Sequence, residues 1–226
     1  MDLSALIAIS RRYGKDNDYV LLGGGNTSVK DGDVMYVKAS GHALGDIDES
    51  GFVRMSLPKL NEIWQKEYPE DTDAREDAVL ADMMDCRLAG ETARPSVEAL
   101  MHSLIPFTYV VHLHPSLVNG LTCSQAGKDS AATHFPDALW IPLVNPGYIL
   151  ANVVREGMIA YEKEKGTVPK VNLLQNHGIF VAGDTPSEIE AAYDAIMAKL
   201  LRHTIRLAHL DARKPDKAKV RKVLDG

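Results

Sequence analysis

The chain has 226 residues, of which 45% are hydrophobic and 25% charged, and its formal net charge at pH 7 is -6. This composition is typical of a globular protein with one sizeable core. The acidic balance excludes nucleic acid as the main partner, since that requires a basic face. No apolar run approaches the ~20 residues of a membrane span, and the N-terminus lacks a signal-peptide pattern, so we expect no membrane partner. Cys86 and Cys123 form no paired motif, which excludes a disulfide scaffold and indicates a cytoplasmic protein.

The N-terminal half of the chain alternates between helical and strand patterns. Apolar residues at helical spacing predict a helix over residues 3–13. Residues 26–30 and 34–38 flank an Asp-Gly turn and predict a hairpin. Further helices are expected over residues 57–67, 71–88 and 96–104.

The C-terminal half adds strands to this pattern. A buried strand is expected over residues 108–113, helices over 116–123 and 148–164, and two further strands over 171–175 and 179–181. A capping box at Thr185 predicts a long helix to about residue 210. Together these elements predict an α/β fold with a mixed sheet. Because no linker divides the chain, we expect one domain over residues 1–210, followed by a basic, solvated tail over residues 211–226.

Two histidines alternate along the predicted strand over residues 108–113. His112 and His114 are two residues apart, so on a strand both imidazoles project from the same face. Two imidazoles at this spacing can hold one divalent ion, and the alternative is a hydrogen-bonded pair without metal. His177 lies at the break between two strands, where Gly178 permits an unusual turn. Three histidines with an open position are typical of catalytic zinc, although imidazole also suits manganese, cobalt and iron.

Glu98 is the candidate general base. It falls in the first turn of the predicted helix over residues 96–104, where a carboxylate also complements the helix dipole. Beside a metal that polarises the carbonyl and hydroxyl oxygens of a substrate, it would move the proton. His102 follows four residues later on the same helix face, so we expect a local pair between these two side chains.

Three loops rich in small residues are candidates for binding an anion. They are residues 23–28 (GGGNTS), 39–41 (ASG) and 94–96 (RPS). The first loop is neither a dinucleotide fingerprint nor a Walker loop, because both motifs require a helix after the loop. An ordinary strand connection is the alternative. Lys38 is the one lysine considered for a Schiff base, and we expect it to be an exposed strand residue.

Taken in order, these motifs resemble those of the class II aldolase/adducin family. They are GNTS at residues 25–28, SG at 40–41, PSVE at 95–98, HLH at 112–114 and NHG at 176–178, and the resemblance spans residues 10–200. The segments GGGNTSVK and RPSVEALMHSLIPF are similar to the aldolase domain of bifunctional rhamnulose-1-phosphate aldolase/short-chain dehydrogenase proteins. The dehydrogenase half of those proteins has no counterpart among these residues.

The resemblance implies a fold, a site and a reaction. The fold would be a three-layer α/β/α sandwich with a central mixed, largely antiparallel sheet, assembled as a homotetramer with active sites at subunit interfaces. The protein would be a zinc-dependent aldolase that cleaves a ketose 1-phosphate to dihydroxyacetone phosphate and an aldehyde. The implied site residues are the metal ligands His112, His114 and His177, the acid/base Glu98, and the phosphate-binding residues Asn26, Ser40, Gly41 and Ser96.

Two departures from the family pattern leave other functions open. Val97 stands where many sugar-phosphate members carry a second serine, and no tyrosine follows Tyr193, so the proton donor is unassigned. The alternatives are a sugar-phosphate 4-epimerase, which typically has Asp where Glu98 stands, and a decarboxylase or dehydratase. A non-catalytic module resembling adducin would have lost the three histidines, and a nicotinamide-dependent oxidoreductase would need the absent fingerprint.

Overall fold

A mixed sheet runs through the middle of the protein. In the computed structural model, which describes residues 1–207, seven strands pair in the order β3-β2-β1-β4-β7-β6-β5. Every pairing is antiparallel except the parallel pair β5–β6. The strands are β1 Asn26–Asp31, β2 Val34–Lys38, β3 Phe52–Ser56, β4 Tyr109–Leu113, β5 Leu139–Ile141, β6 Val171–Leu174 and β7 Gly178–Gly183.

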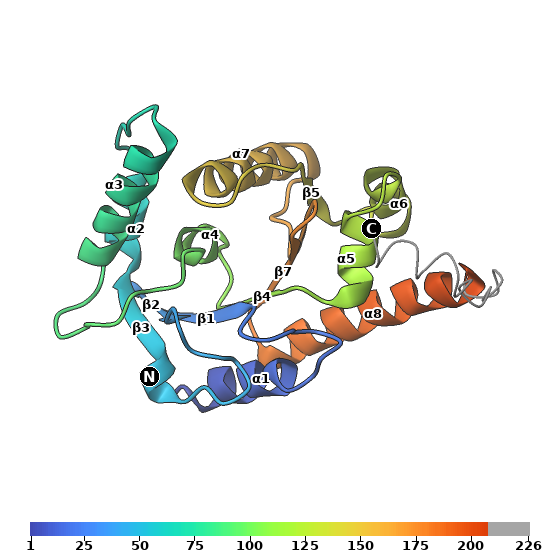
Figure 1. Ribbon diagram of the computed structural model, residues 1–226, viewed down its shortest axis with the longest axis horizontal. Coiled ribbons are helices and arrows are strands. Elements are labelled where there is room, and N and C mark those ends of the chain that lie inside the picture. The colour runs from blue at the N-terminus through green and yellow to red at the C-terminus, as the bar shows by residue number, and fades with distance from the viewer. Residues whose placement is uncertain (208–226) are drawn as a thin grey trace, which may run out of the picture.

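Helices cover both faces of this sheet, as Figure 1 shows. Helices α2, α3, α4 and α7 pack on one face, and α1, α5, α6 and α8 pack on the other. The resulting three layers confirm the expected α/β/α fold class. The helices are α1 Ser4–Gly14, α2 Leu57–Ile63, α3 Thr72–Asp85, α4 Ala99–Leu104, α5 Ser116–Thr122, α6 Gly127–His134, α7 Tyr148–Lys165 and α8 Pro186–Leu207.

The two central strands contribute apolar side chains to two separate cores. Along β4, Val110 belongs to the core beneath α4 and α7, whereas Val111 and Leu113 belong to the core above α1 and α8. Along β7, Phe180 and Ile179 are divided in the same way. This division follows from the alternation of side chains along a strand. It leaves the even-numbered positions of β4 on the face of α4 and α7.

Local sequence signals account for several element boundaries. The turn of the β1–β2 hairpin contains Gly32 with φ +55°, a conformation that glycine adopts without steric cost. Asp71 caps α3 by accepting a hydrogen bond from the backbone of Ala74 at 2.9 Å. The Thr185 hydroxyl accepts from the backbone of Glu188 at 3.3 Å, which forms half of the predicted capping box. The Glu188 carboxylate pairs with Lys170 instead of completing the box.

Two strands and one α-helix of the described residues were not predicted from the sequence. They are strand β3, the three-residue strand β5 and helix α6. β5 is too short to show periodicity, and in α6 only Gly127 and Ala131 are buried, so neither carries a clear apolar stripe. No helix of residues 1–207 is long and apolar enough to cross a membrane. The predicted boundary at residue 210 and the tail over residues 211–226 lie outside the described residues.

Candidate metal centre and its surroundings

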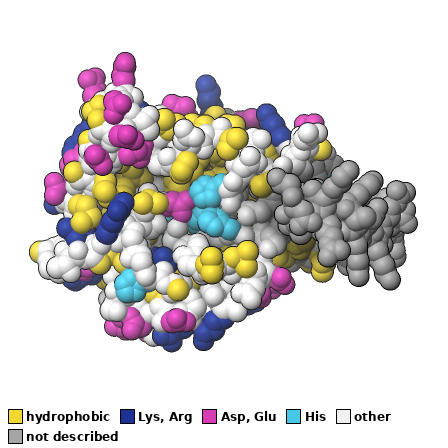
Figure 2. All heavy atoms as spheres, in the orientation of Figure 1, with side chains coloured by type: hydrophobic (Ala, Val, Ile, Leu, Met, Phe, Trp, Pro, Cys, Tyr) yellow, Lys and Arg dark blue, Asp and Glu magenta, His cyan; other side chains and the backbone are white. Residues whose placement is uncertain are grey.

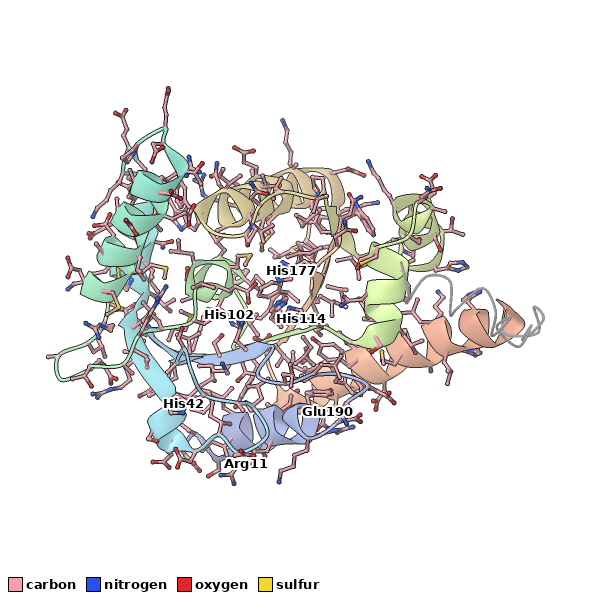
Figure 3. The ribbon with its side chains drawn as sticks, viewed as in Figure 1. Arg11, His42, His102, His114, His177 and Glu190 are labelled. Atoms are coloured by element: carbon pink, nitrogen blue, oxygen red, sulfur yellow. The ribbon has the colours of Figure 1, made fainter. Side chains whose placement is uncertain are left out.

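Three histidine side chains converge beside the end of β4. His112 and His114 project from the same face of the strand, as their spacing predicts, and their Nε2 atoms lie 2.8 Å apart. His177 enters from the turn between β6 and β7, and its ring centroid lies 4.9 Å from that of His112 and 5.1 Å from that of His114. One ligand atom from each residue lies within 4.8 Å of the others, so the three imidazoles could hold one metal ion. Figure 3 shows His114 and His177 pointing toward the same space.

The hydrogen bonds of His112 select the tautomer that binds metals. Its Nδ1 lies 3.0 Å from the carbonyl oxygen of Ile179, which can only accept, so Nδ1 carries the proton and Nε2 has a free lone pair. The side chain is fully buried, and burial lowers the pKa of His112 to about 3. Burial also lowers the pKa of His114. A neutral imidazole with its second nitrogen bonded to a carbonyl is typical of metal-binding histidine.

The glycines next to the histidines allow close approach of the backbone. A Cβ atom on Gly178 would lie 2.5 Å from the carbonyl oxygen of Leu113 and 2.6 Å from Cδ2 of His114. Gly25 has φ +76°, and a Cβ atom there would lie 2.9 Å from the carbonyl oxygen of His112. Both positions therefore require glycine if β1, β4 and β7 are to keep these positions.

The Glu98 carboxylate lies against the imidazoles. It is the N-cap residue of α4, one residue earlier than its expected place in the first turn. Its Oε1 lies 3.2 Å from Nε2 of His177, its Oε2 lies 3.4 Å from Nε2 of His112, and the Asn26 amide donates to Oε2 at 2.5 Å. Burial alone would raise the pKa of Glu98, but the neighbouring imidazoles and the amide outweigh it and hold this pKa well below its ordinary value. Glu98 is therefore an ionised base at neutral pH.

The expected direct pair between Glu98 and His102 is wrong. His102 is fully buried, and its Nε2 lies 2.5 Å from Oδ1 of Asn26, while its Nδ1 lies 2.7 Å from Oγ of Ser28. The physical reason is strand alternation, because Asn26 and Ser28 project from the same face of β1 and together occupy both nitrogens of the imidazole. Asn26 is thus the link between His102 and Glu98, a contact that helical spacing could not have revealed.

Two of the candidate anion loops are joined in the structure. Ala39 and Pro95 form an isolated antiparallel bridge, the Ser96 backbone donates to the carbonyl oxygen of Lys38, and the Ser40 hydroxyl donates to that of Pro95. Ser40 and the adjacent Gly41 are exposed, whereas Ser96 is buried. The Ser96 hydroxyl accepts a hydrogen bond from the backbone of Glu98 at 3.3 Å.

The third candidate loop, residues 23–28, also borders the histidines. A Cβ atom on Gly24 would lie 3.3 Å from Nδ1 of His114. Because residues 26–31 form β1, the glycines lead into a strand as the sequence indicated. Residues 23–28 therefore lie beside His114, residues 94–96 lie beside Glu98, and residues 39–41 are joined to the latter segment.

The expectation that Lys38 is exposed is wrong. Only 6% of its surface is accessible, because the segment around Pro95 covers the end of β2. Burial lowers the pKa of its ammonium group, and the Glu98 carboxylate opposes that shift. The Lys38 ammonium group donates one long hydrogen bond, of 3.4 Å, to the neighbouring carbonyl oxygen of Ala39. A buried cation with spare donors lies beside the two joined loops, which sequence spacing did not indicate.

The histidine cluster is open to solvent on one side. The His177 side chain is 25% exposed, whereas Glu98 beneath it is 12% exposed. Figure 2 shows histidine side chains gathered near the centre of one face, with an acidic side chain beside them. The arrangement combines three ligands, a buried carboxylate and an accessible side from which a small molecule can enter.

The chain belongs to the class II aldolase/adducin family. The family model of the Class II Aldolase and Adducin N-terminal domain matches residues 4–200. Among curated proteins, it is similar to the uncharacterized oxidoreductase YuxG of Bacillus subtilis (strain 168), with 27% identity over 190 residues. This match covers 80% of the chain but 26% of YuxG, so the chain spans about a quarter of the length of that relative.

Solved structures of the family share this fold. The N-terminal class II aldolase domain of a conserved protein from Thermoplasma acidophilum is 26% identical with a TM-score of 0.75, and the match covers 90% of this chain and 94% of that one. An L-fuculose 1-phosphate aldolase is 19% identical with a TM-score of 0.60, covering 96% and 94%. A sugar-phosphate aldolase from Thermotoga maritima is 15% identical with a TM-score of 0.60, covering 93% and 95%.

Proposed function

We propose that this protein is a metal-dependent lyase that cleaves a ketose 1-phosphate to dihydroxyacetone phosphate and an aldehyde. The observation that carries this proposal is the convergence of three imidazoles with an ionised carboxylate in contact with two of them. The names of similar structures, an L-fuculose 1-phosphate aldolase and a sugar-phosphate aldolase, support this substrate class.

His112, His114 and His177 would hold the metal, for which zinc is our first choice. The donor set fits, because three imidazoles with one open side suit zinc and also manganese, cobalt or iron. When bound, such an ion polarises the carbonyl oxygen of the substrate and stabilises negative charge that develops there. The protein holds this donor set in place through the Ile179 carbonyl and the close approach at Gly178.

Glu98 would move the proton at carbon 3 of the substrate. In cleavage, a base takes the proton of the C4 hydroxyl, the C3–C4 bond breaks as C4 becomes the aldehyde carbon, and the electron pair passes to the ketone oxygen. The Glu98 carboxyl, protonated by solvent, then gives its proton to carbon 3, and in the reverse direction the carboxylate removes that proton. Glu98 suits this exchange because it is ionised and already lies within 3.4 Å of two of the imidazoles.

Asn26, Ser40, Gly41 and Ser96 would bind the substrate phosphate. The amide nitrogen of Asn26 uses one hydrogen on Glu98 and keeps the second for another acceptor. Ser40 and Gly41 lie exposed in the loop that pairs with the segment of Ser96. The buried ammonium of Lys38 supports an anion at this place, since a partner of opposite charge would offset its desolvation.

We further propose that the protein is a homotetramer with its active sites at subunit interfaces. The open side at His177 supports this assembly, because a neighbouring subunit could cover it and supply the proton donor for the aldehyde oxygen.

A substrate panel tests the proposed function. Wild-type protein supplied with zinc is incubated with ketose 1-phosphates and their unphosphorylated analogues, and dihydroxyacetone phosphate is measured by enzymatic reduction. We expect release from at least one ketose 1-phosphate. Glu98→Gln keeps the shape of the side chain and removes the base, so turnover should fall about 100-fold or more while metal content stays unchanged.

The same panel distinguishes the alternatives. A new ketose phosphate without dihydroxyacetone phosphate would identify an epimerase and would defeat the proposal. Full turnover in Glu98→Gln would show that another group moves the proton. An absence of turnover with every substrate would favour a decarboxylase or a binding module.

A further inference from the structure

A buried hydrogen-bonded chain runs from Ser28 through His102 and Asn26 to Glu98. The three contacts measure 2.7 Å, 2.5 Å and 2.5 Å in that order. His102 is fully buried in α4, and burial keeps its pKa well below the ordinary value, so the imidazole is neutral. His102 is neither one of the three candidate metal ligands nor one of the residues proposed to bind the substrate phosphate.

The chemistry of the partners gives this chain one direction. The Asn26 Oδ1 can only accept, so Nε2 of His102 must donate and its Nδ1 must accept from the Ser28 hydroxyl. The amide nitrogen of Asn26 then faces Glu98, where a carboxylate requires a donor. Every proton therefore points toward the carboxylate, an arrangement in which successive hydrogen bonds polarise one another in the same sense.

We propose that His102 is a positioning residue that, through Asn26, sets the orientation in which the Glu98 carboxylate meets the substrate. The inference rests on the proposed function, because it assigns His102 a part in the proton exchange that Glu98 performs. It also makes the Nε2–H tautomer of His102 a requirement of the site.

Glu98 needs this support once the imidazoles hold a cation. A ligating nitrogen directs its lone pair at the ion, so Nε2 of His112 and of His177 would have no proton to donate to the carboxylate. Among the described side chains, Asn26 would then be the donor left in contact with Glu98. An amide can rotate by 180° and present its oxygen instead, and the hydrogen bond from His102 to that oxygen prevents this rotation.

The packing around His102 keeps its ring in place. Its imidazole meets the Phe180 ring edge-on, with centroids 5.4 Å apart and planes at 69°. The Phe180 ring also stacks against His112, with centroids 4.1 Å apart and planes at 21°. Phe180 therefore contacts both the histidine that orients Glu98 through Asn26 and a histidine of the candidate metal centre, and it fixes the spacing between them.

Paired substitutions separate positioning from simple packing. His102→Phe keeps a ring of similar size and removes both hydrogen bonds, whereas His102→Gln keeps a donor that can reach Asn26. We expect His102→Phe to lower kcat about 10–100-fold, the usual effect of losing such an outer hydrogen bond, with little change in KM or metal content. His102→Gln should recover most of kcat. His134→Phe, at the end of α6, is the control and should change none of these quantities.

The outcomes of these assays are distinct. Equal kcat in wild type and His102→Phe would overturn the positioning role, and so would equal losses in the Phe and Gln variants at matched thermal stability. A fall in metal content that accounts for the lost turnover would also overturn it. If His102→Phe does not fold, Ser28→Ala serves in its place and should lower kcat by a smaller factor, again without loss of metal.

Nitrogen-15 NMR of histidine-labelled, metal-free protein gives a readout that needs no activity. The His102 signals, identified by their loss in His102→Gln, should report the Nε2–H tautomer. Asn26→Leu should shift this Nε2–H signal strongly. The Nδ1–H tautomer would overturn the inference even in an active enzyme, whereas an inactive wild type with the expected tautomer would defeat the proposed function and leave the hydrogen-bonded chain established.

Discussion

At the scale of single residues, Gly178 allows the turn that carries His177 to pack against β4. Gly178→Ala would place a methyl group within 2.6 Å of a backbone carbonyl and of the His114 ring. We expect a loss of about 1–3 kcal/mol in the free energy of unfolding, as is typical of overpacking, and weaker zinc binding because His114 must move. Chemical denaturation and metal titration measure both effects.

Gly120 provides the control for this substitution. It lies in α5, and a Cβ atom there would have no neighbour within 4 Å. Gly120→Ala should leave zinc affinity unchanged and stabilise the protein slightly, since alanine has the better helix propensity. Equal zinc affinities in the two alanine variants would show that the turn tolerates a side chain and that the proposed crowding is wrong.

Substitution of Ser40, also a change of a single residue, tests the proposed phosphate subsite. Its exposed hydroxyl donates to the Pro95 carbonyl and can rotate toward a ligand. Ser40→Ala should raise KM for the phosphorylated substrate about tenfold or more, because a hydrogen bond to a charged group contributes about 1.5–3 kcal/mol. KM for the unphosphorylated analogue should stay unchanged, and Ser40→Thr should resemble wild type. A parallel rise for both substrates would argue against phosphate at this loop.

The positions of individual site residues could be predicted where they depend on a single strand or a single turn. The common direction of His112 and His114 follows from strand alternation, and His177 was recognised at its turn. The contact between Asn26 and Glu98 could not be predicted, because it depends on how β1 and α4 meet. For the same reason the His102–Asn26 bond was missed, although the alternation of Asn26 and Ser28 along β1 was a signal that could have suggested it.

At the scale of elements, the Lys30 side chain links the end of β1 to the loop between α4 and β4 through hydrogen bonds. Its ammonium group donates to the carbonyl oxygens of Ile105 at 2.6 Å and Phe107 at 3.1 Å. Burial lowers the pKa of Lys30 to about 7. An unfolded lysine keeps its ordinary pKa near 10.4, so between these values the unfolded chain binds the extra proton and stability rises with pH.

Lys30→Met removes this titration. The free energy of unfolding of wild type, relative to that of Lys30→Met, should therefore rise by about 1 kcal/mol per pH unit between pH 7 and pH 10. Urea denaturation of both proteins at pH 7, 8.5 and 10 measures this difference in the free energy of unfolding. The test depends on how the difference changes with pH, so a constant difference between the two proteins does not affect it. A difference that stays constant over this range would show that Lys30 keeps an ordinary pKa in the folded protein.

Elements with a strong pattern of their own could be predicted, and those that depend on a neighbour could not. Helices α3 and α8 carry caps at Asp71 and Thr185, and the β1–β2 hairpin carries an Asp-Gly turn. Strand β3 is defined by its pairing with β2, and strand β5 is defined by its parallel pairing with β6. Strand register is also a tertiary property: the pairing of Asn26 with His112 sets the Asn26 amide beside the candidate metal centre.

At the scale of the whole molecule, the sheet order explains how distant segments reach one site. Strands β1, β4 and β7 are adjacent in the sheet, although long stretches of the sequence separate them. The face covered by α4 and α7 thus receives Asn26 from β1, His112 from β4 and His177 from the turn before β7. The mixed α/β class was predictable from composition and pattern, and the ordered motifs indicated the family, but neither determines which strands are neighbours.

Under the proposed function, cleavage requires a metal held by the three histidines. Elemental analysis of purified protein, before and after chelation and with cleavage of ketose 1-phosphates assayed in parallel, measures this requirement. We predict about one zinc per chain, loss of dihydroxyacetone phosphate release on chelation, and its return with zinc. His112→Ala should lose both metal and turnover. Full cleavage by metal-free protein, or by metal-free His112→Ala, would contradict the proposed metal requirement.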